Sequence, residues 1–183
     1  MKIGFDIDDV FFPTAQNIVN IINTLYPDVL LEGIKTYGIE ESYTYIPKYI
    51  IDNAVERAVE ETEEPIEDAI DVLRYFINNK IVSLIYFITS RPENTRQRTL
   101  EQIKSNLSDV PFVIYHKKDK TNTIDRLGLD YFFEDRVDHS EKIADSTKCT
   151  PVLFDRPWNQ NVYEFHRVED WKGICSLVIN HLA

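Results

Sequence analysis

The sequence predicts an α/β fold, a parallel sheet flanked by helices, with a small and mainly helical segment inserted after the first strand. From residue 81 onward, apolar runs alternate with helical segments, as is typical of βαβ units. The runs are continuously apolar, which is typical of parallel strands that are covered on both faces. A long helical stretch separates the first strand from the second and accounts for the predicted insertion.

The elements follow from apolar periodicity and from helix start and stop signals. Strands are expected at 2–6, 81–88, 111–115, 131–134 and 151–154. Pro65 is well placed to open a helix over 65–79, because Glu67 and Asp68 put negative charge in its first turn. Further helices are expected at 93–107, 121–127, 138–146 and 169–182.

Residues 13–64 are too long for a simple crossover and predict a helical cap beside the end of the first strand. Apolar residues at helical spacing predict a helix over 14–26 that Pro27 ends, and a second helix over 50–62. Residues 28–49 are irregular or short-helical, and 60–64 form an acidic turn. The core domain then comprises residues 1–12 and 65–183.

Composition excludes several classes of protein. The 183 residues, 43% hydrophobic and 28% charged, are those of an ordinary globular chain without a membrane-spanning run or a signal peptide. Cys149 and Cys175 form neither a disulfide framework nor a Cys/His zinc site, and they fit a reducing cytoplasm. A net charge of −11 disfavours a nucleic-acid polymer as partner. A homodimer is left open.

Polar residues follow each predicted strand where it ends. Ligands bind at this edge of open α/β sheets, and a cluster of acids there needs a metal or an opposite charge. The sequence therefore predicts one crevice that holds a hard cation and an acid able to act as nucleophile or proton donor. In strand order, these residues are Asp6, Asp8 and Asp9; Thr89, Ser90 and Arg91; His116 followed by Lys117, Lys118 and Lys120; Glu134, Asp135, Arg136 and Asp138; Asp155 and Arg156.

The order of these residues resembles the haloacid dehalogenase (HAD) superfamily of phosphotransferases. The match consists of Asp6-x-Asp8-x-Val10, Thr89 after an apolar strand, Lys120, and Glu134-Asp135 with Asp138. It implies a Rossmann-like core with a C1-type cap at the insertion. The segments 88–92, 119–121, 134–138 and 153–159 are further similar to the 5′(3′)-deoxyribonucleotidase branch, which implies hydrolysis of nucleoside monophosphates with the cap contacting base and sugar.

The resemblance also implies catalytic roles. Asp6 would attack phosphorus and form an aspartyl-phosphate, and Asp8 would protonate the leaving alcohol and then deprotonate water. Thr89 and Ser90 would bind the phosphate, and Lys120 would balance its charge.

The cofactor implied is Mg²⁺, held by the Asp6 carboxylate, the Asp8 backbone carbonyl and Asp135. Glu134 and Asp138 are expected to lie beside these ligands and to support them. The family often has Asp-Asp-Arg-Pro-Asp at 134–138, so whether Glu134 or Asp135 meets the metal is left open. Asp9 is interpreted as a turn residue.

The expected substrate contacts are aromatic residues of the cap and strand-end arginines. Aromatic rings can stack on a base, although packing within the cap is the commoner role for each of them. Trp158 is expected to pack, and the four histidines show no metal-ligand spacing. The contacts proposed are Phe12, Tyr43, Tyr45, Arg91 and Arg136.

Two alternatives fit the same residues. The substrate could be a sugar phosphate or another small phosphometabolite, for which a polar cap pocket is expected in place of stacked aromatics. A signalling receiver domain also combines strand-end acids, a Thr or Ser and a Lys with Mg²⁺. However, its phosphoacceptor Asp follows the third strand, where this chain has His116 and lysines.

Overall fold

The computed structural model describes residues 1–62 and 64–182. Glu63, within the predicted acidic turn and cap, and Ala183, at the end of the predicted core, lie outside the described residues. Across the described ranges, the structure has six strands: β1 Ile3–Phe5, β2 Ile85–Thr89, β3 Phe112–His116, β4 Tyr131–Glu134, β5 Thr150–Phe154 and β6 His166–Val168. They pair in parallel in the order β3-β2-β1-β4-β5-β6. This order confirms the predicted α/β class with a parallel sheet. In the same ranges, no helix combines the length and the apolar character needed to cross a membrane.

The five predicted strands match the structure to within one residue at each end, except at the start of the second. The run that starts at Ile81 enters the sheet only at residue 85, because the backbone N–H of Ile81 donates to Phe76 and wraps the end of the preceding helix. A sixth strand was not predicted, since it is short and contains His166 and Arg167.

The seven predicted helices are present in the predicted order, and the described residues contain one more, of four residues, within the stretch 28–49 that was predicted to be irregular or short-helical. The helix predicted over 65–79 starts later than expected. Pro65 does not open a helix: Asp68 adopts a left-handed φ of 64°, and the helix begins at Ala69. The backbone N–H of Ile66 instead donates to the carbonyl of Phe11 and anchors the segment beside β1. The α-helices are α1 Thr14–Ile22, α2 Ile39–Ser42, α3 Lys48–Glu61, α4 Ala69–Asn78, α5 Arg96–Asn106, α6 Thr121–Leu127, α7 Val137–Ser146 and α8 Trp171–Leu182, with 3-10 turns η1 Leu31–Gly33, η2 Glu93–Thr95 and η3 Pro157–Asn159.

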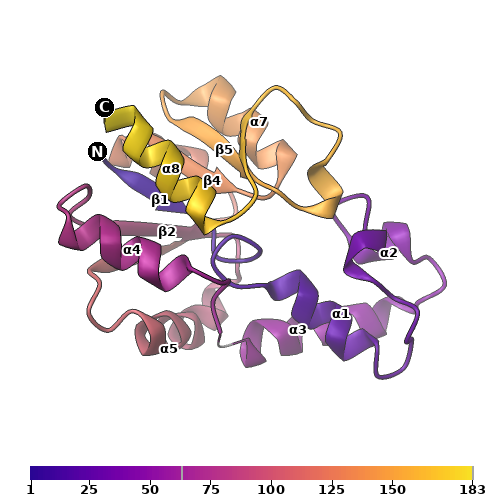
Figure 1. The fold of residues 1–183 in the computed structure, drawn as a ribbon. Coiled ribbons are helices and arrows are strands. Elements are labelled where there is room, and N and C mark those ends of the chain that lie inside the picture. The colour runs from indigo at the N-terminus through magenta and orange to yellow at the C-terminus, as the bar shows by residue number, and fades with distance from the viewer. Residues whose placement is uncertain (63, 183) are drawn as a thin grey trace.

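Helices cover both faces of the sheet, which explains its continuous apolar strands. On one face Phe5 stacks on Phe133 and Trp171, with ring centroids 5.1 and 5.0 Å apart. Helices α4, α5 and α8 pack on this face, and α4 and α8 stand in front of the sheet in Figure 1. On the other face, Phe132 packs against α6 and α7 through Ile124 and Ile143.

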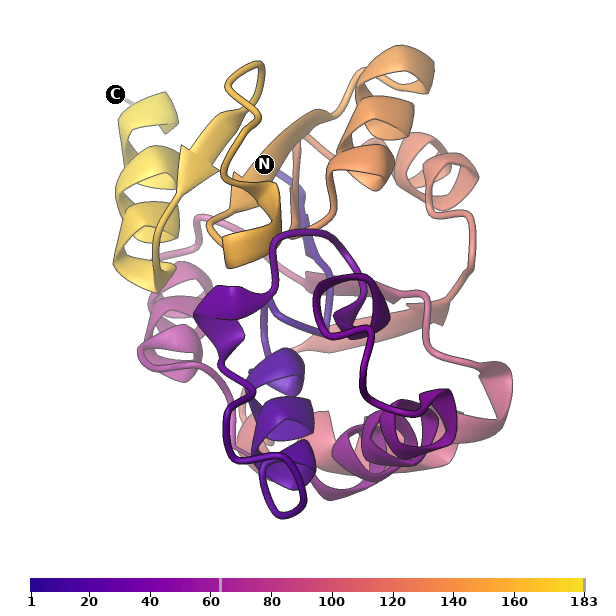
Figure 2. The same ribbon diagram turned by 90° about the vertical axis from the view of Figure 1, so that its right-hand side faces the viewer.

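Residues 14–61, here called the helical insert, have an apolar cluster of their own. Helices α1, α2 and α3 contribute Ile18, Ile39 and Ala54 to it. In Figures 1 and 2 the insert, indigo to purple, lies beside the sheet at the edge where β1 ends. The insert therefore stands over the residues that follow the strands.

Gly4 lies where the middle of β1 contacts its neighbours most closely. A Cβ at this position would come within 2.6 Å of Leu129 Cδ1 and 2.8 Å of Phe132 Cδ2. We expect Gly4→Ala to lower the free energy of unfolding by about 1–3 kcal/mol, because packed cores resist added volume. Urea denaturation measures this loss. Gly173→Ala is the matched control, since its new Cβ meets nothing closer than 3.3 Å; equal losses in the two variants would contradict the explanation.

Candidate active site

The carboxyl ends of β1 and β4 lie side by side in the middle of the sheet, with Phe5 paired to Phe133. The chain runs from β1 outward to β2 and β3, and then returns to β4 on the other side of β1. Ligands bind in the crevice formed where the strand order reverses in this way. Asp6, Glu134 and Asp135 are the residues that this topology brings to the crevice.

Lys120 enters the crevice from the start of α6. Its Nζ lies 2.5 Å from Asp6 Oδ2 and 2.8 Å from Glu134 Oε2, and the residue is only 3% exposed. Burial would lower the pKa of Lys120, but the charges of the two carboxylates outweigh it and hold the pKa above its ordinary value. Lys120 is therefore a charged ammonium at neutral pH.

Three buried acids gather beside this ammonium, which pairs with two of them, Asp6 and Glu134. One oxygen each from Asp6, Glu134 and Asp135 lies within 4.8 Å of the other two. Burial raises the pKa of Asp6 and of Asp135 well above the ordinary value; Glu134 adds to both shifts, and Lys120 opposes that of Asp6. Buried carboxylates in excess of their partners are costly, and an all-oxygen donor set suits a hard divalent cation. The cluster is consistent with a divalent metal.

The neighbouring acids Glu134 and Asp135 differ in their partners. Glu134 Oε2 accepts a hydrogen bond from Lys120 and lies 3.2 Å from His139 Nδ1. Burial would raise the pKa of Glu134, but Lys120 and His139 hold it far below the ordinary value. Asp135 Oδ2 accepts a 3.0 Å hydrogen bond from the neutral indole of Trp158, while burial and nearby acids raise its pKa. Asp135 therefore has the greater need of a further cation.

Asp8 stands at the mouth of the crevice and is held from two sides. Its Oδ1 accepts a 2.6 Å hydrogen bond from the Thr14 hydroxyl. Arg91 donates from Nη2 to Oδ1 at 2.7 Å and from Nε to Oδ2 at 3.0 Å. Burial would raise the pKa of Asp8, but Arg91 and Thr14 outweigh it and lower the pKa below the ordinary value.

Thr89 and Ser90 follow β2 at the same edge. Thr89 is fully buried, and its hydroxyl accepts a 3.1 Å hydrogen bond from the Arg91 backbone N–H. The Ser90 hydroxyl oxygen is shielded from solvent and finds no partner among the described residues. Such unpaired buried groups are uncommon in proteins, and Ser90 lines a cavity together with Asp6 and Asp135. Its hydroxyl is available to a ligand.

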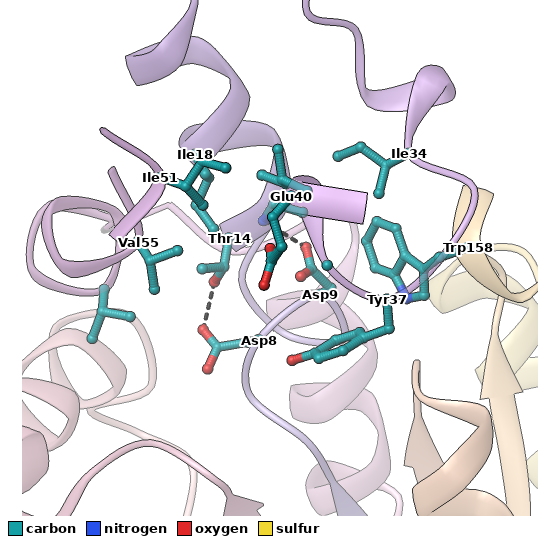
Figure 3. Close-up of a pocket in the computed structure, with 14 residues that line it drawn as sticks. Asp8, Asp9, Thr14, Ile18, Ile34, Tyr37, Glu40, Ile51, Val55 and Trp158 are labelled. Atoms are coloured by element: carbon teal, nitrogen blue, oxygen red, sulfur yellow. Dashed lines mark hydrogen bonds between the residues drawn. The ribbon is translucent and has the colours of Figure 1, made fainter. Parts of the chain in front are cut away.

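A pocket of about 330 Å³ opens between the helical insert and the acids. Figure 3 shows Ile18, Ile51 and Val55 on one side, the rings of Tyr37 and Trp158 on the other, and Glu40 between them. The charged residues of its described lining are all acids, so the pocket repels anions. The lining comprises Asp8, Asp9, Thr14, Ala15, Ile18, Ile34, Tyr37, Gly38, Ile39, Glu40, Ile51, Val55, Val59 and Trp158.

The three aromatic residues predicted to contact substrate, Phe12, Tyr43 and Tyr45, lie outside the pocket. Phe12 is fully buried in the core cluster. The Tyr43 hydroxyl donates to the Leu30 carbonyl, and the Tyr45 hydroxyl donates to Asp28. None of the three is part of the pocket lining. Phe12 is thus part of the core, and hydrogen bonds within the insert engage Tyr43 and Tyr45. The aromatic residues that line the pocket are Tyr37 and Trp158.

Arg136 and Asp138 form a pair at the rim of the site. Arg136 donates from Nε and Nη2 to the two carboxylate oxygens of Asp138, at 3.0 and 2.8 Å. Its guanidinium carbon lies 4.0 Å from the centroid of the Tyr37 ring. The Asp138 side chain is half exposed and is engaged with Arg136, so it does not join the buried acids.

Several residues of the site gave no usable signal in the sequence. His139 is the third residue of α7, which starts three residues after the end of β4, and this short separation was the one signal that could have linked it to Glu134. Trp158 was expected only to pack, yet its indole N–H binds Asp135. Glu40 reaches the pocket from α2, a four-residue helix in a stretch without clear periodicity.

Asp9 occupies the turn that follows these acids. Its φ of 59° is left-handed, and its Oδ1 accepts a 2.8 Å hydrogen bond from the Ala15 backbone. Arg156 Nε donates to its carbonyl at 2.8 Å. The residue therefore shapes the connection between β1 and α1.

A protein-family model described as 5′ nucleotidase, deoxy (pyrimidine), cytosolic type C protein matches residues 1–182. The chain belongs to this family. Membership confirms the resemblance to HAD phosphatases of the deoxyribonucleotidase branch, and it makes the chain a phosphatase- or nucleotidase-type hydrolase rather than a receiver domain.

Solved structures of HAD hydrolases share the fold. A haloacid dehalogenase-like hydrolase from Xanthomonas campestris is 16% identical with a TM-score of 0.59, covering 98% of this chain and 95% of that one. A HAD family hydrolase from Deinococcus radiodurans R1, with bound phosphate and sodium, is 13% identical with a TM-score of 0.62, covering 99% and 96%. The HAD hydrolase YfnB from Bacillus subtilis, bound to magnesium, is 13% identical with a TM-score of 0.60, covering 97% and 98%. No curated protein matches the chain.

Proposed function

We propose that this hydrolase is a Mg²⁺-dependent phosphomonoesterase that acts on nucleoside monophosphates. The observation that carries the proposal is the junction of two environments at Asp8. On one side lies the buried cluster of Asp6, Lys120 and Asp135. On the other lies a mainly apolar pocket with two aromatic rings. The first suits a phosphoryl group, and the second suits the flat, apolar faces of a base.

In the proposed reaction, an Asp6 oxygen bonds to phosphorus as the ester P–O bond breaks. Arg91 and Thr14 lower the pKa of Asp8 in the free protein, so Asp8 gains its proton only when the negative charge of the bound phosphate raises that pKa. The electron pair stays on the ester oxygen, which takes this proton from Asp8 and leaves as the alcohol. Asp8 then removes a proton from water, and the resulting attack releases phosphate from Asp6. Thr89 and Ser90 hydrogen-bond the phosphoryl oxygens, and the Lys120 ammonium balances their charge together with that of Asp6.

The residues present fit a divalent cation, since their donors are buried carboxylate oxygens in excess of positive charge. Asp6, the Asp8 carbonyl and Asp135 would hold Mg²⁺, and Glu134 would remain with Lys120 and His139. When bound, the ion neutralises phosphoryl oxygens and so favours attack by an anionic nucleophile.

The helical insert is proposed to act as the cap, with residues 13–64 as the cap and residues 1–12 and 65–183 as the core domain. Its pocket wall is the part that would contact base and sugar. Because the described lining contains acids and no Lys or Arg, the pocket favours a leaving group without a second anionic group. A nucleoside meets this requirement, whereas a sugar bisphosphate or a phosphorylated carboxylic acid does not.

A substrate panel with Mg²⁺ tests the proposal. We expect phosphate release from nucleoside or deoxynucleoside monophosphates with kcat/KM at least about tenfold above that for hexose phosphates or phosphoglycolate, which corresponds to about 1.4 kcal/mol of preference. A higher kcat/KM for a sugar phosphate would contradict the proposed substrate class. A folded protein that releases phosphate from no monoester would overturn the proposed activity.

Mg²⁺ is expected to stabilise the fold through Asp135. At 100 times its Kd, a ligand that binds only the native state adds about 2.7 kcal/mol, which is roughly 5–10 °C in Tm for a chain of this size. We expect this shift in thermal scans of the wild type and its loss in Asp135→Asn. Asp145→Asn, on the exposed face of α7, is the control. An unchanged Mg²⁺ shift in Asp135→Asn would contradict the assigned ligand set.

Glu40 is expected to discriminate against a second anionic group on the substrate. In Glu40→Gln, kcat/KM for a nucleoside 3′,5′-bisphosphate relative to the monophosphate should rise about two- to fivefold, since one exposed like-charge contact is worth up to about 1 kcal/mol. Steady-state kinetics with both substrates measures the ratio. Glu41→Gln, a neighbour outside the pocket lining, should leave it unchanged.

A further inference from the structure

Gln102 on α5 connects the exit of the helical insert to the core. The side chain is 1% exposed. Its Nε2 donates to the backbone carbonyls of Val59 at 2.8 Å and Thr62 at 2.7 Å, and more weakly to Glu60 at 3.3 Å. These carbonyls belong to the last turn of α3 and to the residue that follows it. The buried amide of Gln102 therefore ties the C-terminal end of the insert to α5 of the core.

The other end of the same amide holds Arg91. Gln102 Oε1 accepts a 2.9 Å hydrogen bond from Arg91 Nη1, which also reaches the Thr99 hydroxyl at 3.3 Å. Carbonyls surround one end of the Gln102 amide and a guanidinium faces the other, so only one orientation of the amide satisfies both. The Arg91 side chain is 2% exposed, and its remaining donors bind Asp8.

The donors around Asp8 are unequally divided between its two oxygens. Oδ1 receives Arg91 Nη2 at 2.7 Å, Arg91 Nε at 3.1 Å and the Thr14 hydroxyl at 2.6 Å. Oδ2 receives only Arg91 Nε, at 3.0 Å, among the described residues. Oδ1 is saturated with donors, which leaves Oδ2 with the capacity to exchange a proton.

Both connections between the insert and the core therefore reach the Asp8 carboxylate, one directly through Thr14 and the other through Gln102 and Arg91. Thr14 is the first residue of α1, where the insert begins, and Gln102 holds the segment where it ends. Asn17 Nδ2 donates to the Thr62 hydroxyl at 2.8 Å and ties the two connections together. A shift of the insert relative to the sheet would move the donors that orient Asp8.

We propose that Gln102 is a positioning residue, which acts through Arg91 to fix the Asp8 carboxylate so that Oδ2 exchanges the proton with the leaving oxygen. This inference rests on the proposed function, in which Asp8 is the acid. As the ester P–O bond breaks, the electron pair remains on the ester oxygen, and the Oδ2 proton moves to that oxygen. Gln102 itself contacts neither substrate nor reacting atoms.

The test compares two leaving groups in the first turnover, with Mg²⁺ present. An alkoxide, as in a nucleoside monophosphate, needs the proton from Asp8, whereas the nitrophenolate of p-nitrophenyl phosphate leaves with little help. In Gln102→Met we expect release of nucleoside to slow about 10- to 100-fold, as small misplacements of catalytic groups do. Release of nitrophenol should slow less than about threefold, and KM for the nucleotide should change less than threefold.

Two further variants keep the test decisive. Gln97→Met alters an exposed glutamine of the same helix, bonded to Glu101, and should match the wild type on both esters. Arg91→Lys retains the charge and the Gln102 contacts to the insert but loses the fork that grips Asp8. It should show the same leaving-group selectivity, and it decides the question if Gln102→Met does not fold.

The outcomes separate the inference from the activity on which it rests. A folded wild type that releases neither leaving group overturns the proposed function and the inference with it. A wild type active on both esters, with variants that slow both releases equally or neither, overturns the inference alone. Selective loss of nucleoside release with an unchanged KM supports it.

Discussion

Replacing Asp6 by asparagine is expected to reduce turnover by about 10⁴-fold or more, as the removal of a nucleophile does in enzymes that form a covalent intermediate. The amide keeps the shape of the side chain but cannot form the phosphoryl ester. Phosphate release from the best monophosphate of the panel measures the loss. Asp145→Asn, an exposed residue of α7, should retain full activity. Activity of Asp6→Asn within tenfold of the wild type would rule out Asp6 as the nucleophile.

The same substitution is expected to leave the metal-free fold as stable as the wild type or more stable. Burial raises the pKa of Asp6 in the native state above its unfolded value. The native state then binds more protons than the unfolded state between these two pKa values, so stability falls as pH rises through that interval. Asparagine cannot ionise and avoids this loss. Thermal scans in EDTA from pH 4 upward should show a weaker decline for Asp6→Asn than for the wild type.

The sheet and the acid cluster were predictable because a local sequence pattern locates each strand, and the end of the strand then fixes where the next residues lie. Asp6 and Asp135 are far apart in the chain, but Asp6 directly follows one apolar run and Asp135 follows another with only Glu134 between. Parallel strands deliver their carboxyl ends to one edge, so finding the runs was enough to bring these acids together. Lys120 followed in the same way from its position after the third strand. The choice between Glu134 and Asp135 needed their partners, Lys120 and Trp158, which no spacing indicates.

The features that the sequence did not predict depend on contacts between segments that carry no periodic signal. Strand β6 has only three residues and pairs through its backbone, so its side chains include His166 and Arg167. Tyr43 and Tyr45 were expected at the substrate, but their hydroxyl groups find backbone and Asp28 partners within the insert. Gln102 meets carbonyls 40 or more residues away, and nothing in its own helix marks it.

Replacing Lys120 by methionine is expected to cause the largest loss of stability of any single substitution at the site. The variant leaves Asp6 and Glu134 buried without the ammonium that lies 2.5 and 2.8 Å from them. Removing one partner of a buried ion pair costs about 3–5 kcal/mol, or roughly 6–20 °C in Tm for a chain of this size. Scanning calorimetry in EDTA at pH 7 measures the loss. Activity should also fall, because the variant lacks the positive charge that balances the phosphate.

The pH dependence of the Lys120→Met defect distinguishes lost charge from lost packing. In the wild type, Lys120 and His139 keep the pKa of Glu134 below its unfolded value, so this contribution to stability is present above the unfolded carboxyl pKa and disappears as pH falls through the native one. Without Lys120 the acids can protonate at low pH, and the difference from wild type should shrink as the pH approaches 4. Lys142→Met, whose side chain is 65% exposed, should unfold like the wild type. A Lys120→Met defect of constant size from pH 4 to pH 8 would mean that packing of the lysine stem, rather than the charge that it brings to Asp6 and Glu134, holds this edge of the sheet together.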